Sequence, residues 1–174
     1  MGKKFRGIFG KFKIGVIIFI MFINLLIKLL PTRPIFAHCD IPCGIYDPHQ
    51  MQMAAHTIIR MMNLFNEAKD DLNKTIRVVR IKEKHASLCE EEIVTLWADY
   101  FKEEHYKEYP SLLELINSAI KLTGKVRQSV DLESANELLA KTQEIAEIFW
   151  KTKGLEPIRI ASGYPTEGEI VSHK

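Results

Sequence analysis

The chain has 174 residues, a length for one domain, and its 24 basic and 22 acidic side chains give a formal net charge of +2. Residues 1–37 hold seven of the basic residues and no acidic one, so 17 basic residues face all 22 acidic ones in the remainder, a net charge of −5. A net negative surface argues against nucleic acid as the partner.

Residues 1–37 have the order of a secretory signal peptide: a basic start, an apolar run over residues 14–30, and the small residue Ala37 before a cut. We expect a leader peptidase to remove them, so that the mature chain begins at His38 and is not membrane-bound. A retained anchor is the alternative, because the 17 residues of the apolar run are at the short limit for a bilayer span. The leader suggests an exported or lumenal protein, in a periplasm or a thylakoid lumen.

Residues 47–154 show apolar positions at helical spacing in four successive stretches. The four predicted helices begin near Asp47, Lys74, Tyr109 and Ser129 or Asp131. The second is predicted to continue to about His105. Because the connections are short and polar, we expect an all-α fold, an up-and-down four-helix bundle over residues 47–154. Residues 155–174 contain Pro and Gly and are predicted to form an extended C-terminal arm, with a disordered tail as the alternative.

Residues 38–46 read His-Cys-Asp-Ile-Pro-Cys-Gly-Ile-Tyr and form a loop, since proline and glycine interrupt regular structure there. A cut after Ala37 would give His38 a free amine beside its imidazole. Cys39 would add an amide nitrogen and a thiolate, and Cys43 a second thiolate. Two thiolates and two nitrogens in a plane suit Ni(II) or Cu(II) better than tetrahedral Zn(II).

These donors favour redox chemistry over hydrolysis, because anionic sulfur and amide nitrogen lower the potential of a Ni(III)/Ni(II) couple. The alternative for the two cysteines is a Cys39–Cys43 disulfide, which is credible in an exported chain. Tyr46 is near enough to stand over an open axial face of the metal, and a packing role at the edge of the bundle is its alternative.

The run His-Cys-Asp-x-Pro-Cys-Gly-x-Tyr-Asp-Pro over residues 38–48 resembles the nickel hook of the nickel-containing superoxide dismutases. Residues 96–101, Tyr109-Pro110 and residues 148–150 resemble further landmarks of that family. The leader lies outside the resemblance, and the segment after Lys153 is only loosely covered by it. The name "hook" is used below for residues 38–46.

The resemblance implies one nickel ion per subunit, bound by the amine and imidazole of His38, the amide and thiolate of Cys39 and the thiolate of Cys43. It implies that superoxide is disproportionated to oxygen and hydrogen peroxide by Ni(II)/Ni(III) cycling. It places Asp40 and Tyr46 beside the metal as candidate catalytic residues. It also implies a hexamer of four-helix-bundle subunits.

Two further expectations follow from the resemblance. Some family members support the axial imidazole with a Glu and an Arg, where this chain has Ala54 and His85. Superoxide is an anion, so we expect Lys or Arg side chains near the hook, although the sequence does not assign them.

Alternatives to this function and location remain. In this family a leader can also be trimmed without export, which would leave a cytoplasmic protein. The competing functions are an exported helical module that binds a partner, and a nickel or copper carrier without turnover. In a metal-free protein, a Cys39–Cys43 disulfide would close the hook.

Overall fold

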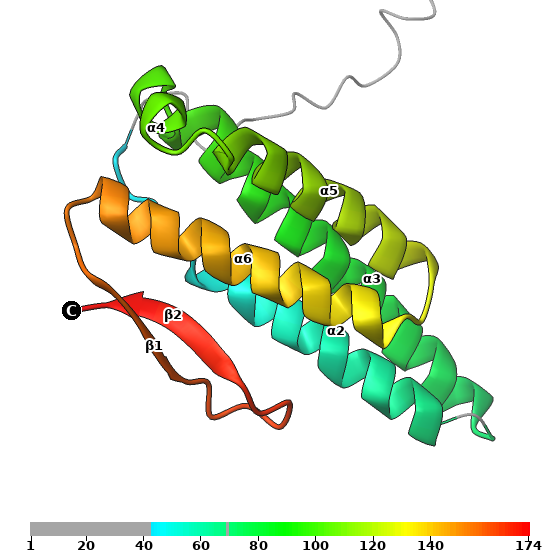
Figure 1. Cartoon of the computed structure of the whole chain (residues 1–174). Coiled ribbons are helices and arrows are strands. Elements are labelled where there is room, and N and C mark those ends of the chain that lie inside the picture. Colours follow the sequence, from blue (N-terminus) through cyan, green and yellow to red (C-terminus); the bar gives the residue numbers. More distant parts are fainter. Residues whose placement is uncertain (1–42, 69) are drawn as a thin grey trace, which may run out of the picture. The chain divides into compact units, whose positions relative to one another are not determined.

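The computed structural model describes residues 43–68 and 70–174 (Figure 1). The predicted leader and hook residues 38–42 lie outside the described residues. Within the described ranges, no helix combines the length and the apolar character that crossing a membrane requires.

The elements of the described residues are α2 (His49–Glu67), α3 (Leu72–Thr95), the π-helical turn η1 (Leu96–Tyr100), α4 (Glu103–Glu108), α5 (Leu112–Gln128), α6 (Leu132–Thr152), β1 (Pro157–Ala161) and β2 (Glu169–His173). Helix α2 packs against α3 and α6, and α5 packs against the same two helices (Figure 1). Helices that follow one another in sequence are thus neighbours, and α6 closes the ring on α2. The predicted all-α four-helix bundle is confirmed.

Two of the long helices, α3 and α6, begin where the sequence offers an aspartate as a cap. Asp71 Oδ1 accepts the backbone N–H of Lys74 at 2.9 Å before α3, and Asp131 Oδ1 accepts that of Ser134 at 3.2 Å before α6. Such caps satisfy backbone donors that have no partner within the helix. The apolar stripes then meet in one core. Its largest fully buried side chains include Phe149, Met51, Ile58, Met62, Ile93, Leu112, Ile116, Leu138 and Ile145.

The prediction of one helix from residue 74 to about residue 105 is wrong at its C-terminal end. The helix widens into η1, where the N–H of Phe101 bonds to the carbonyl of Leu96 at 2.8 Å, and Phe101 itself is extended (φ −72°, ψ 132°). The side chain of Phe101 is buried, which holds this break against the core. Short π-helical turns are frequent at functional sites. Here the break turns the chain from η1 into the short helix α4.

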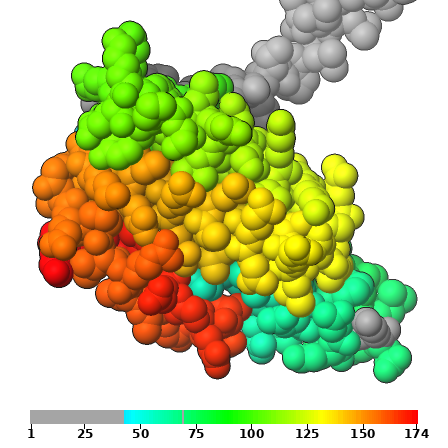
Figure 2. All heavy atoms as spheres, viewed as in Figure 1, coloured from blue at the N-terminus to red at the C-terminus, as the bar shows by residue number. Residues whose placement is uncertain are grey.

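The prediction of an extended C-terminal arm is also wrong. Strands β1 and β2 pair antiparallel, with Arg159 opposite Val171, and fold against α6 and α2 of the same chain (Figures 1 and 2). The connecting turn closes through a hydrogen bond from the N–H of Ser162 to the carbonyl of Gly168 at 2.9 Å. Gly168 has φ +76°, a conformation that a glycine adopts without strain. Val171 reaches the core with 2% of its surface exposed.

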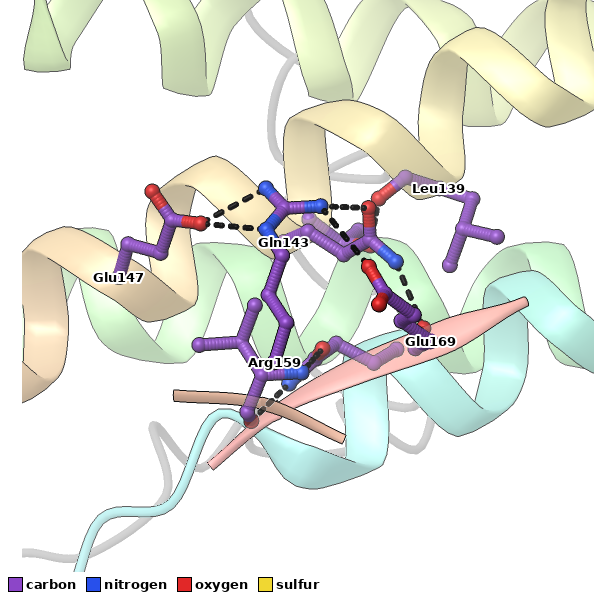
Figure 3. A network of polar contacts seen from close by, with 8 residues as sticks. Leu139, Gln143, Glu147, Arg159 and Glu169 are labelled. Atoms are coloured by element: carbon purple, nitrogen blue, oxygen red, sulfur yellow. Dashed lines mark hydrogen bonds and ion pairs between the residues drawn. The ribbon is translucent and has the colours of Figure 1, made fainter. Parts of the chain in front are cut away.

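Arg159 attaches the hairpin to α6 (Figure 3). Its Nε donates to Glu147 Oε1 at 2.8 Å, and one terminal nitrogen donates to Gln143 Oε1 at 3.1 Å. Gln143 Nε2 in turn donates to the carbonyl of Glu169 at 2.6 Å. One polar network thus joins both strands to the same helix.

Candidate metal centre

The described part of the hook begins at Cys43. Its thiol is free and exposed, with Sγ 3.9 Å from the carbonyl of Ile45. Gly44 has φ +72°, a backbone conformation that would strain any residue with a side chain. The glycine therefore turns the chain between the exposed thiol of Cys43 and the half-buried Tyr46.

Tyr46 fastens this end of the hook to the bundle. Its ring packs against the core, and its centroid lies 5.5 Å from that of Tyr100, the last residue of η1, at an interplanar angle of 54°. Ring pairs at such separations contribute attraction beyond the burial of apolar area. The structure therefore confirms a packing contact for Tyr46.

Tyr100 is the centre of a cluster at this end of the molecule. Its ring centroid lies 4.5 Å from that of Phe149 and 5.6 Å from that of His105, which is stacked on it at 21°. Its hydroxyl is 2.7 Å from Thr152 Oγ1, and Lys153 Nζ lies 5.3 Å from the ring centroid. Burial raises the pKa of Tyr100, so the hydroxyl keeps its proton and its hydrogen bond at neutral pH.

A cavity of about 290 Å³ lies against these residues. It is lined by Gly44 and Tyr46 of the hook, Asp99, Tyr100, Lys102, Glu104 and His105 of the η1–α4 segment, and Lys153. Two ammonium groups thus share its wall with two carboxylates. The cavity adjoins the hook, and its lining includes the local positive charge that the sequence led us to expect.

His105 is held by the backbone at the start of α4. Its Nδ1 accepts the N–H of Lys102 at 3.1 Å, so in the neutral ring the proton belongs on Nε2. Nε2 is 3.9 Å from Glu104 Oε1. The imidazole therefore fixes the backbone of Lys102, whose side chain reaches the cavity.

Of the predicted ligands, the structure describes Cys43, while His38 and Cys39 lie outside the described residues, as does the predicted catalytic residue Asp40. Within residues 43–68 and 70–174, no group of three or more His, Cys, Asp or Glu side chains is arranged to hold a metal ion. Metal binding by Cys43 would therefore need donors from the hook residues before it. The amine, amide, imidazole and thiolate of His38 and Cys39 are of the types that nickel accepts.

Residues 34–153 match the family model described as nickel-containing superoxide dismutase. The chain belongs to this family. It is 38% identical to the nickel superoxide dismutase of Streptomyces seoulensis over 123 residues, which cover 71% of this chain and 93% of that protein. The corresponding protein of Streptomyces coelicolor is 35% identical over the same length and the same shares.

Solved structures of nickel-containing superoxide dismutases share the fold. A crystal structure with nickel ligation after partial X-ray-induced reduction superposes with a TM-score of 0.64 at 38% identity, covering 67% of this chain and 99% of the other. A native nickel superoxide dismutase gives a TM-score of 0.63 at 35% identity, with the same coverage. The predictions of the family, of a nickel cofactor and of an enzyme are confirmed, and the carrier and the non-enzymatic module are not favoured.

The structure describes Ala54 and His85, the two positions at which some family members carry the Glu and Arg that support the axial imidazole. Ala54 is buried in α2, with 1% of its surface exposed. His85 is half-buried on α3 and donates from Nδ1 to the carbonyl of Ile81 at 2.9 Å, which leaves Nε2 as the acceptor of its neutral ring. Position 54 of this chain therefore supplies no carboxylate to the imidazole.

Among the cavity residues that were not assigned a role from the sequence, four make the contacts described above: Tyr100, Lys102, His105 and Lys153. Tyr100 lies in one of the stretches that resembled family landmarks, and the other three lie beside such stretches. Only the break at η1 and the end of α6 bring them to the hook.

Proposed function

We propose that this protein disproportionates superoxide with one nickel ion per subunit, held by His38, Cys39 and Cys43 at an N-terminus created by cleavage after Ala37. The observation that carries this proposal is the position of Cys43 and Gly44, in the described part of the hook. In a chain of this family, an exposed, unpaired thiol at Cys43 lies next to a cavity whose lining includes ammonium groups.

Nickel in such a site supplies a one-electron couple, which takes an electron from one superoxide ion and returns an electron to another. The chain's part begins with binding. The Cys43 thiol is exposed and can lose its proton to a metal, and the donors of His38 and Cys39 complete a set of sulfur and nitrogen ligands. Neither zinc nor calcium favours this combination in a plane.

The lysines of the cavity support an anionic substrate. The net charge after residue 37 is −5, which repels superoxide at long range, so local ammonium groups have to attract it. Lys102 and Lys153 both line the cavity beside Gly44. They approach it from different elements, η1–α4 and the end of α6.

Tyr46 is proposed to limit access and to orient small species beside the metal. Its ring is held against Tyr100, so its position is fixed by packing before any ligand arrives. Hydrogen peroxide carries two protons that superoxide lacks, and water in the cavity is their proposed route. Asp40, three residues before Cys43, is proposed to assist from within the hook.

The assembly and the compartment are also part of the proposal. We propose a hexamer because the family resemblance implies one; Ile45, 79% exposed, and Trp97, 42% exposed, leave apolar surface available for contacts between subunits. Large exposed apolar groups commonly mark protein contacts. Export to a periplasm or lumen, after removal of the leader by a peptidase, is supported by the order of residues 1–37.

The test is to isolate the protein from its native host and determine its N-terminal residue, intact mass and nickel content, together with the rate of superoxide loss and the appearance of peroxide. We expect a chain that begins at His38, holds one nickel ion and consumes superoxide. A functioning form in which Ala37 is still joined to His38 would overturn the proposal. Nickel binding without turnover would favour the carrier.

A further inference from the structure

Side chains from two helices take the place of a third strand along β2. Gln52 Oε1 accepts the N–H of Val171 at 2.7 Å, and Gln52 Nε2 donates to the carbonyl of Val171 at 3.0 Å. The carbonyl of Glu169 accepts from Gln143 Nε2 at 2.6 Å and lies 3.2 Å from His56 Nε2. Three backbone groups of β2, the N–H and carbonyl of Val171 and the carbonyl of Glu169, are therefore satisfied by side chains of the bundle.

Gln52 also contacts the residue from which α2 starts. Its Nε2 lies 3.3 Å from the carbonyl of Pro48, and Gln52 is fully buried. Asp47, the residue before Pro48, accepts the N–H of His49, the first residue of α2, at 2.7 Å. One buried amide thus joins β2 to the turn that follows the hook and its ligand Cys43.

Other contacts hold this turn from the opposite side. Cys89 of α3 directs its thiol toward the carbonyl of Met51 at 3.5 Å, and Tyr46 packs on Tyr100. The first turn of α2 is therefore fixed between α3 and β2. Of these two supports, α3 lies within residues 34–153, the part of the chain that matches the family, and the hairpin lies beyond it.

We propose that the C-terminal hairpin and the nickel site are coupled through Gln52. The docked β2 strand holds the first turn of α2 in the position from which the hook binds nickel, and bound nickel stabilises the docked hairpin by the same amount, because such coupling is reciprocal. Gln52 is in this sense a positioning residue. The coupling rests on the proposed function, since it takes the hook to be the nickel site.

The first experiment needs no variant. Hydrogen exchange of backbone amides is measured on the mature protein in its nickel-loaded form and after nickel removal. We expect nickel to slow exchange at Val171 by about tenfold, within the usual range of coupling between sites, and to leave the middle of α5 unchanged. Equal exchange at Val171 with and without nickel would overturn the coupling.

The second experiment compares two matched variants. Gln52→Met and Gln143→Met each remove one buried amide that holds the hairpin, but only Gln52 also contacts the start of α2. We expect Gln52→Met to release nickel to a chelator about tenfold faster than the unmodified protein, and Gln143→Met to release it at the unmodified rate. Equal release rates from both variants would contradict a role specific to Gln52.

The outcomes separate this coupling from the proposed function. If the protein binds nickel and consumes superoxide, but the β2 amides exchange at the same rate with and without nickel, the proposed function stands and the coupling is refuted. If the mature protein binds no nickel, both the proposed function and the coupling are refuted. If Gln52→Met does not fold, the exchange measurement on the unmodified protein still decides.

Discussion

The rings of Tyr46 and Tyr100 lie 5.5 Å apart, and this contact joins the hook to the last residue of the π-helical turn. An uninterrupted helix would not turn at this point into the segment that bears Lys102 and His105. The irregularity of η1 thus brings an aromatic anchor for the hook and a charged cavity wall together.

Replacing Tyr100 tests whether that cluster stabilises the protein mainly through its rings. Tyr100→Leu removes the ring contacts with Tyr46, His105 and Phe149, and we expect the free energy of unfolding to fall by about 2–4 kcal/mol. Tyr100→Phe keeps the rings and loses the hydrogen bond to Thr152, which should cost about 1 kcal/mol. Denaturant unfolding measures both, and equal losses would show that the hydroxyl dominates.

The two hook cysteines should be required for nickel and for activity. We expect Cys39→Ser and Cys43→Ser each to reduce bound nickel and superoxide consumption to background, while the helical circular dichroism is kept. Ser87→Ala, a change at an exposed serine of α3, is the control. A serine variant that remains active would refute the ligand assignment.

The cavity lysines should control how fast superoxide arrives. Lys102→Ala and Lys153→Ala are each expected to lower kcat/KM by about tenfold at low ionic strength and to weaken its dependence on salt. Lys121→Ala, an exposed change on α5 outside the cavity, is the matched control. Stopped-flow rates over a series of salt concentrations give the answer, and an unchanged salt slope would exclude steering by these lysines.

Docking of the hairpin should weaken in acid because of His56. Its Nδ1 lies 2.8 Å from Thr166 Oγ1, and burial lowers the pKa of His56, against a smaller raising effect of the Glu169 carbonyl. The unfolded chain, with an ordinary histidine pKa of about 6.5, then binds more protons than the folded one. Stability therefore falls as the pH drops through about 6.5 toward the folded pKa, by at most about 1.4 kcal/mol per pH unit.

Thermal unfolding at about pH 7.5 and about pH 5.5, on either side of that ordinary value, measures this effect. His56→Gln places an amide, which does not titrate, beside Thr166 and the carbonyl of Glu169. The midpoint temperature of unfolding of this variant should therefore change less between the two pH values. A variant that loses as much stability in acid as the unmodified protein would assign the effect to other groups.

The bundle was predictable because its causes are local. Aspartates cap α3 and α6, and apolar residues return at helical spacing, so residues near in sequence carry the signal. The proposed ligand set rests on an equally local signal, since its donors lie within six consecutive positions.

The errors have non-local causes. The hairpin docks through Gln52 and Gln143, which lie far from it in sequence and read as ordinary polar positions on helices. Nothing in the sequence around residue 96 distinguishes a π-helical turn from a continuing α-helix, because the break depends on burying Phe101 against the rest of the core. The grouping of Lys102 with Lys153 depends on that break.

The burial of Cys89 gives the protein a built-in internal reference. Its thiol is fully enclosed, and burial raises its pKa to about 12, so the reactive thiolate is scarce there at neutral pH. Cys43, in contrast, faces the solvent. Alkylation of the native, reduced protein with a maleimide should therefore label the hook and spare the interior. With the hook thiols kept reduced, protection from labelling would report how much of a preparation carries metal.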